Sequence, residues 1–142
     1  MSESNQLASV TAGEERSQVV VSDLKRTQIV MYAGASGDFN PLHTDEPFST
    51  QVAGNPTVMS HGMLVMGLAS QVLTEWFGLP NVRRYRARFQ SPTWPGDTIS
   101  VTAKVESVEE VEGERRAEVA LRATTRDGAV AVLSGSATVL VR

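Results

Sequence analysis

HGMLVMGLASQVLTEWFG, residues 61–78, contains the most apolar window of the sequence and predicts a long helix. One set of apolar residues recurs every four positions, at Leu64, Leu68, Val72 and Trp76. A second set, Met63, Met66, Leu73 and Phe77, widens this face almost to the full circumference. A helix that is apolar on nearly every side is buried, and Gly78 is typical of a helix end. We therefore expect one central, buried helix that begins near His61.

From residue 83 onward the apolar period changes to two, which is the period of a half-buried strand. Apolar and polar residues alternate over 84–89, 98–105 and 116–124, and a final run over 130–141 is apolar on both faces near its ends. Turn formers separate these runs at Pro92, at Pro95 with Gly96, around Gly113, and at Asp127 with Gly128. A meander of strands around one buried helix predicts an α+β architecture with an antiparallel sheet. The 142 residues are enough for one such domain.

The first eighteen residues have neither the basic region nor the apolar region of a signal peptide, and we expect them to form a mobile tail. The folded domain is then expected over residues 19–142. After the apolar run 19–21, Ser22 is a suitable N-cap and Asp23 favours a helix start. The buried face of this helix is expected to comprise Leu24, Ile29, Val30 or Met31, and Ala33, with Gly34 and Gly37 ending it. A short helical turn is expected over 47–52.

Composition excludes several classes of function. The formal net charge of −3 argues against a protein that binds nucleic acid through overall charge. The chain has no cysteine, so disulfides, thiolate chemistry and cysteine-containing zinc sites are excluded. The apolar window of 63–73 is too short to span a bilayer, and we expect a cytoplasmic protein that does not bind membranes.

The segment GDFNPLHTD, residues 37–45, is the main candidate for chemistry. Asn40 and Pro41 stand between Asp38 and His43, and these turn formers predict a rigid loop. A stiff loop that carries a carboxylate and an imidazole suits acid-base catalysis. The alternative is a hydrogen-bonded loop in which Asp38 caps a turn and His43 is packed beneath it.

Three segments together resemble the MaoC-like dehydratases, the R-specific enoyl-CoA hydratase group of the hot-dog fold. They are YAGASGDFNPLHTD at 32–45, SHGM at 60–63 and PTWPGD at 92–97, and the resemblance extends from about residue 19 to the C-terminus. It implies that Asp38 and His43 hold one water and add it across a trans-2-enoyl thioester, or catalyse the reverse elimination. It also implies that Asn40 orients the site and that the backbone N–H of Gly62 faces the thioester carbonyl. No cofactor is implied.

These residue types suit that reaction. A neutral imidazole accepts a proton from water near neutral pH, and an adjacent aspartate can share the protons of the same water. Attack on the double bond moves charge onto the thioester oxygen, which the free N–H groups at a helix N-terminus stabilise. Because a backbone donor cannot be deleted by changing a side chain, Gly62→Val is the suitable probe.

Other side chains are weaker candidates. Ser36, Met63, Arg84 and Arg86 are candidates for substrate binding, but Ser36 equally suits a helix cap, and Met63 suits a core position. The arginines of 83–88 fit phosphates, although their alternation alone predicts a solvated strand face. We interpret His61 as a buried or capping residue. A metal site formed by Asp38, His43 and His61 lacks an identifiable fourth ligand, and we expect no metal.

The expected substrates are thioesters of coenzyme A or of acyl carrier protein. A hot-dog thioesterase is the alternative enzyme, and a non-catalytic subunit of a heteromeric dehydratase is the alternative outside catalysis. Because an open antiparallel sheet leaves unpaired edge strands, we expect a homodimer with sites at the subunit boundary.

Overall fold

The computed structural model describes residues 6–142, and residues 1–5 of the expected tail lie outside this range. Its strands are β1 (Glu15–Val21), β2 (Val82–Phe89), β3 (Ile99–Val111), β4 (Glu114–Thr125) and β5 (Val130–Leu140). Its longer helices are α1 (Arg26–Ser36) and α2 (Gly62–Phe77). Three short helical segments complete the chain: η1 (Pro41–His43), η2 (Phe48–Val52) and η3 (Leu79–Asn81). No helix within residues 6–142 is long and apolar enough to cross a membrane.

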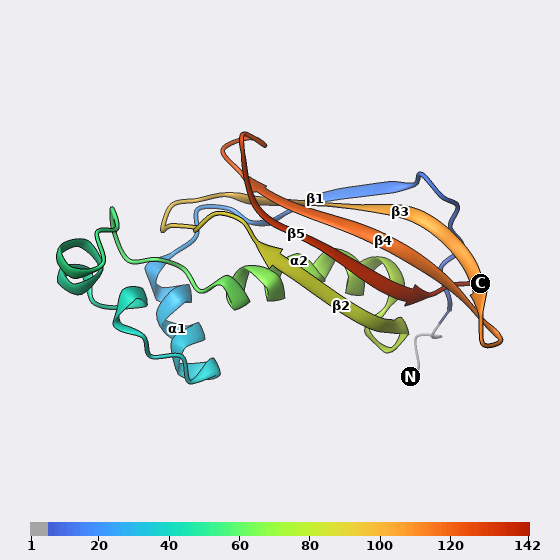
Figure 1. Ribbon diagram of the computed structural model, residues 1–142, viewed down its shortest axis with the longest axis horizontal. Coiled ribbons are helices and arrows are strands. Elements are labelled where there is room, and N and C mark those ends of the chain that lie inside the picture. Colours follow the sequence, from blue (N-terminus) through green and yellow to red (C-terminus); the bar gives the residue numbers. More distant parts are fainter. Residues whose placement is uncertain (1–5) are drawn as a thin grey trace.

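The strands form one five-stranded antiparallel sheet in the order β1-β3-β4-β5-β2. The sheet curves over α2, while α1 and the loops between the two helices lie at one end (Figure 1). This arrangement confirms the predicted α+β architecture, in which an antiparallel sheet wraps around one long helix. The meander β3-β4-β5 follows the predicted turns, and β2 crosses over to pair with β5.

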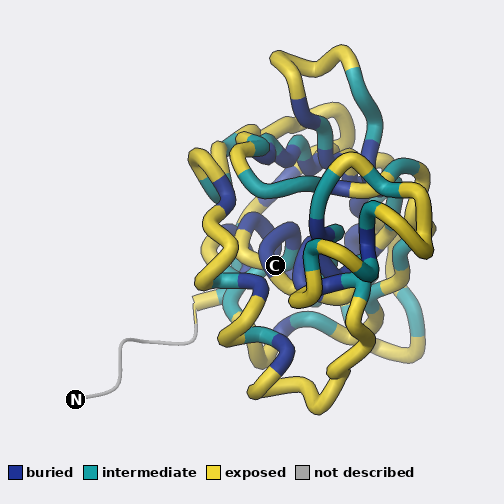
Figure 2. Tube along the Cα trace, turned by 90° about the vertical axis from the view of Figure 1, so that its left-hand side faces the viewer, coloured by how far each residue is buried: buried dark blue, intermediate teal, exposed yellow. Residues whose placement is uncertain are grey.

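The core lies between α2 and the concave face of the sheet. Alternate residues of β3 and β4 are buried, as the period of two predicts: Ile99, Val101, Ala103, Val105, Ala117, Val119, Leu121 and Ala123. Buried residues gather at the centre of the molecule, and exposed residues surround them (Figure 2). Each fully buried aliphatic side chain contributes roughly 1.5–3 kcal/mol of hydrophobic stabilisation relative to leaving it exposed.

Helix α2 agrees with the predicted length, and Gly78 follows it as the C-cap. The helix is buried around most of its circumference, as predicted, and one narrow stripe of α2 faces solvent. The exposed residues recur every four positions at Met63, Gly67, Gln71 and Glu75. Met63 is 56% exposed and is not a core residue.

The N-terminal predictions need correction. Residues before position 19 pack against the rest of the domain. Val10 is 3% exposed, and the backbone N–H of Gly13 donates to the carbonyl of Val105 at 2.8 Å. Strand β1 begins at Glu15 and pairs with β3. A mobile tail up to residue 18 is therefore wrong for residues 10–18. The first four residues of β1 are polar or charged, so the pattern of apolar residues does not reveal the start of this edge strand.

The first helix begins later than Ser22. Asp23 has a φ of 54°, in the left-handed region, which interrupts a right-handed helix. The backbone of Leu24 is hydrogen-bonded to both Gly96 and Asp97, so this residue is held against the loop after β2. Leu24, Ile29 and Ala33 are buried as predicted, but Val30 and Met31 are exposed. Gly37, with a φ of 77°, is the C-cap, whereas Gly34 lies inside the helix.

Candidate active site

The loop after α1 is held by a series of bonds between side chains and the backbone. The Ser36 hydroxyl accepts from the N–H of Asp38 at 3.2 Å, and the Asp38 carboxylate accepts from the N–H of Asn40 at 3.2 Å. The Asn40 side-chain oxygen in turn accepts from the N–H of Leu42 at 3.0 Å and caps η1, which ends at His43. These local bonds confirm the rigid loop, because each turn is fixed by the side chain two residues earlier.

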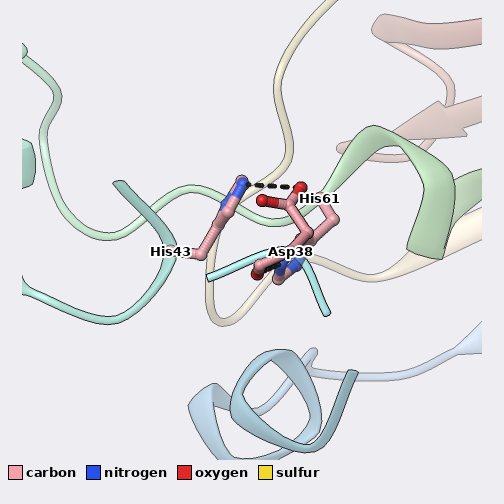
Figure 3. A group of neighbouring side chains, drawn as sticks. All are labelled: Asp38, His43 and His61. Atoms are coloured by element: carbon pink, nitrogen blue, oxygen red, sulfur yellow. Dashed lines mark hydrogen bonds and ion pairs between the residues drawn. The ribbon is translucent and has the colours of Figure 1, made fainter. Parts of the chain in front are cut away.

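Asp38 and His43 point toward each other (Figure 3). The distance between Asp38 Oδ2 and His43 Nε2 is 3.7 Å, which is longer than a direct hydrogen bond. The His43 side chain is 7% exposed, while that of Asp38 is 53% exposed. The backbone carbonyl of Met59 lies 2.5 Å from His43 Nδ1 and can only accept, so a neutral His43 has its proton on Nδ1. The free lone pair on Nε2 then faces the carboxylate.

His61 lies beneath this pair. Its ring stacks on that of His43 with centroids 3.6 Å apart and an interplanar angle of 21°. Its Nε2–H donates to the backbone carbonyl of Asp38 at 3.1 Å, and Tyr32 contacts it edge to face at 4.8 Å between centroids. The predicted buried imidazole is confirmed, since His61 is 2% exposed. It occupies the N-cap position of α2 but makes no side-chain capping bond.

Gly62, the first residue of α2, borders a mostly apolar cavity of about 340 Å³. No side chain caps this helix end, so the N–H groups of the first turn are not satisfied in the usual way by the N-cap residue. The ring of Phe89 covers Gly62 closely: a Cβ added to Gly62 would lie 3.2 Å from the ring. The remaining lining residues come from the segment before α2, from α2 itself, and from the sheet and the loop after β2: Met59, Ser60, Val65, Gln90, Ser91, Pro92, Thr93 and Val132.

The segment around residue 60 contacts both the catalytic candidates and the cavity. Met59 lines the cavity and also holds His43 Nδ1, while Gly62 lines the cavity and directly follows His61. Neither Asp38 nor His43 lines the cavity, but His43 is bonded to Met59 and Asp38 to His61, within the short segment that borders the cavity at the N-terminal end of α2.

An exposed ion pair supports the segment that carries Met59. The Glu46 carboxylate accepts from Arg26 at 2.8 Å, from the Thr57 hydroxyl at 3.0 Å and from the N–H of Val58 at 3.2 Å. The hydrogen bond from the Arg26 guanidinium holds the pKa of the Glu46 carboxyl below its usual value. These contacts tie α1 to the residues immediately before Met59.

The ligand atoms of Asp38, His43 and His61 lie within 4.8 Å of one another. Stacking of the two imidazoles places their ring-nitrogen lone pairs in nearly parallel planes, so these lone pairs do not converge on one ion. One nitrogen of each ring is also bonded to a backbone carbonyl. The arrangement therefore suits proton transfer better than metal coordination.

Over residues 8–127 the sequence matches the family described as MaoC like domain. The chain belongs to the MaoC-like family. The match covers the loop with Asp38 and His43, the start of α2 and most of the sheet. It also begins before residue 19, in agreement with the packed N-terminal segment.

Two named proteins similar to this MaoC-like chain are a dehydratase and a hydratase. The 3-hydroxyacyl-thioester dehydratase Y of Mycobacterium tuberculosis is 37% identical over 109 residues, which are 70% of this chain and 37% of that protein. The (R)-specific enoyl-CoA hydratase of Rhodospirillum rubrum is 29% identical over 130 residues, or 90% of this chain and 87% of that protein. The chain thus spans well under half the length of the first of these relatives.

A solved structure gives the same result for the fold. The (R)-hydratase from A. caviae involved in PHA biosynthesis superposes with a TM-score of 0.79 and 25% identity, over 94% of this chain and 98% of that one. The MaoC-like chain has the hot-dog fold that the sequence resemblance implied.

The structure separates the weaker candidates for substrate binding. Ser36 holds the Asp38 backbone, and Met63 lies in the exposed stripe of α2, directly after Gly62. Arg84 and Arg86 are exposed on β2, and neither lines the cavity beside Gly62. Arg86 instead borders a shallower hollow of about 330 Å³, together with Arg88, Ser134 and Ser136.

Two contributors to the site were not predicted from the sequence. The carbonyl of Met59 sets the tautomer of His43, but any residue could supply that carbonyl, so no residue type signals it. Phe89 covers Gly62, and its signal was available: it is a large apolar residue at the end of an arginine-rich run.

Proposed function

We propose that this MaoC-like domain is an (R)-specific enoyl-thioester hydratase, or in reverse a 3-hydroxyacyl-thioester dehydratase. The observation that carries the proposal is the orientation of the pair: the free lone pair of His43 Nε2 faces the Asp38 carboxylate at 3.7 Å, beside an apolar cavity. This separation suits one water bound by both groups. The names of the relatives support the same chemistry.

In the proposed hydration, the water oxygen bonds to C3 of the enoyl thioester while His43 Nε2 takes one of its protons. Asp38 accepts a hydrogen bond from the other O–H and stabilises the imidazolium that forms. The π electrons of the double bond move toward the thioester oxygen, where the N–H of Gly62 donates to the developing negative charge. The enolate then takes the proton from His43 at C2, so hydrogen and hydroxyl add from the same side and His43 returns to its neutral form.

The test is hydration of crotonyl-CoA and of longer trans-2-enoyl-CoAs. The reaction is monitored by the decrease in the ultraviolet absorbance of the conjugated thioester. Loss of a positioned acid or base typically lowers kcat by about 10²–10⁴-fold, and we expect this for Asp38→Asn and for His43→Ala. Asp45→Asn is a matched control, because Asp45 lies in the same segment and its carboxylate accepts a hydrogen bond from the N–H of Phe48, away from the pair. Circular dichroism and thermal unfolding check that each variant is folded.

Wild-type activity in both site variants would contradict the proposal. A thiol-reactive dye separates hydration from thioester hydrolysis, since only hydrolysis releases free coenzyme A. Thiol release without hydration would identify a thioesterase instead.

We further propose that the enzyme is a homodimer. Strands β1 and β2 are the two edges of the sheet, and edge strands have backbone groups that a second sheet can pair with. Phe89 ends β2 and lines the cavity, so a second copy at that edge would close over this cavity. Light scattering that shows a fully active monomer would contradict this. An inactive chain that gains activity with a second MaoC-like protein would indicate a heteromer.

A further inference from the structure

His61 is a buried titratable residue that the proposed reaction does not use. It is 2% exposed, and its Nδ1 atom has no hydrogen-bond partner within residues 6–142. A buried polar atom without a partner is unfavourable, because it has lost its hydrogen bonds to water. An apolar ring of similar size would fill the same space without this cost. A role of the other ring nitrogen would account for an imidazole at this position.

That other nitrogen contacts the catalytic loop. Nε2–H donates to the backbone carbonyl of Asp38 at 3.1 Å, so the residue that carries the carboxylate is held at its own peptide group. The same ring lies flat against His43 with centroids 3.6 Å apart. His61 thus touches both members of the pair, one through a hydrogen bond and the other through its face.

The surroundings leave His61 little freedom. Tyr32 of α1 contacts its ring edge to face, and Gly62 begins α2 immediately after it. His61 therefore fixes the position of the Asp38 peptide relative to the start of α2, where the proposed oxyanion donor lies. A displacement of His61 would move the carboxylate relative to both His43 and Gly62.

We propose that His61 is a positioning residue that aligns the Asp38–His43 pair through the hydrogen bond from its Nε2–H to the Asp38 carbonyl. The catalytic consequence rests on the proposed hydratase function. The structural part does not, because it concerns the geometry of the free protein. Misplacement of a catalytic group by about 1 Å can cost about 100-fold in rate, so we expect a loss of about 10–100-fold in kcat when the Nε2 donor is removed.

Two substitutions separate the hydrogen bond from the ring. His61→Phe retains a flat aromatic ring of similar size but has no donor. His61→Gln places an amide N–H close to the position of Nε2 but lacks the ring. We expect His61→Phe to lower kcat by about 10–100-fold with KM within about twofold of wild type, and His61→Gln to recover most of that loss. A residue that only fills space would give the opposite order.

Nitrogen NMR of ¹⁵N-histidine-labelled protein provides a readout that does not depend on activity. The chain has two histidines, so His61→Phe and His61→Gln each leave only the signals of His43. We expect the His43 ring-nitrogen signals to be displaced in the phenylalanine variant and to return toward wild type in the glutamine variant. In wild-type protein, His61 should carry its proton on Nε2.

The outcomes are distinguishable. A wild-type protein without hydratase activity would remove the proposed function, while the NMR comparison would still test the positioning role. A wild-type kcat in His61→Phe, equal losses in the phenylalanine and glutamine variants, or a His61 proton on Nδ1 in wild type would each overturn the positioning proposal. The last measurement needs no variant and therefore holds even if His61→Phe does not fold.

Discussion

A side chain added at Gly62 should damage activity far more than stability. The ideal Cβ would lie 3.2–3.3 Å from three atoms of the Phe89 ring, closer than the usual 3.5–4.0 Å between carbon atoms. A valine adds two further methyl groups at this point, so the ring must move within the space that borders the helix N-terminus. Because Phe89 is 48% exposed, it can move without disturbing the core.

The expected magnitudes differ for catalysis and folding. Loss of one oxyanion donor lowers kcat by about 10²–10³-fold, and we expect Gly62→Val to lower kcat by about 10²-fold. An exposed ring that can yield should limit the stability cost to about 1 kcal/mol, which is about 4 °C in Tm for a domain of this size. The matched control is Gly67→Val in the exposed stripe of α2, where an added Cβ meets nothing within 4 Å.

The assay is hydration of crotonyl-CoA by the wild type and the two glycine variants, with Tm measured on the same samples. We expect Gly67→Val to retain wild-type kcat and to be neutral or slightly more stable, since valine has a better helix propensity than glycine. A folded Gly62→Val protein with kcat within about threefold of wild type would refute the role of this amide, because an oxyanion donor is worth far more than that.

Three further predictions concern stability. A Cβ at Gly135 would lie 2.6 Å from a backbone oxygen of β2, so Gly135→Ala should separate β5 from β2 and cost about 1–3 kcal/mol, measured by thermal unfolding. Hydrogen bonding to Arg26 lowers the pKa of Glu46 from its ordinary 4.5, so its stabilisation is complete above pH 4.5 and is lost as the pH falls through the lower folded-state value. Glu46→Gln should therefore lower Tm at pH 7, and the difference from wild type should shrink toward pH 3. Burial raises the pKa of Tyr85 from 10.0 to about 12, so the unfolded chain loses this proton first and stability should fall between these pH values. Tyr85→Phe should abolish this loss of stability between pH 9 and pH 11, measured by denaturant titration at both pH values. The variant should also be about 1 kcal/mol less stable at neutral pH, because it lacks the hydrogen bond from the Tyr85 hydroxyl to the Met66 carbonyl in α2.

Periodicity in the sequence was sufficient for the elements that form the core. The apolar spacing over 61–78 predicted α2 and its end at Gly78, and alternation predicted the buried faces of β3 and β4. Periodicity was insufficient where tertiary contacts override local preference. Asp23 and Leu24 suit a helix, but their backbone is held against residues 96–98, so α1 begins at Arg26.

The candidate site divides in the same way. The types and spacing of Asp38, Asn40 and His43 already predicted a stiff loop with an acid-base pair, because turn chemistry is local. Their sequence could not reveal that a carbonyl at Met59 orients His43, since backbone carbonyls have no residue-type signature. It also could not reveal the stacked position of His61, which depends on how α2 meets the loop.

Residue types over a few neighbouring positions were enough to predict the central helix, the strands from β2 to β5 and the presence of the carboxylate–imidazole pair. The orientation of that pair, the ring stacked against His43 and the cavity next to the segment 59–62 follow only from the folded arrangement. These properties depend on contacts between residues far apart in the chain, such as Asp38 with His61 and Gly62 with Phe89.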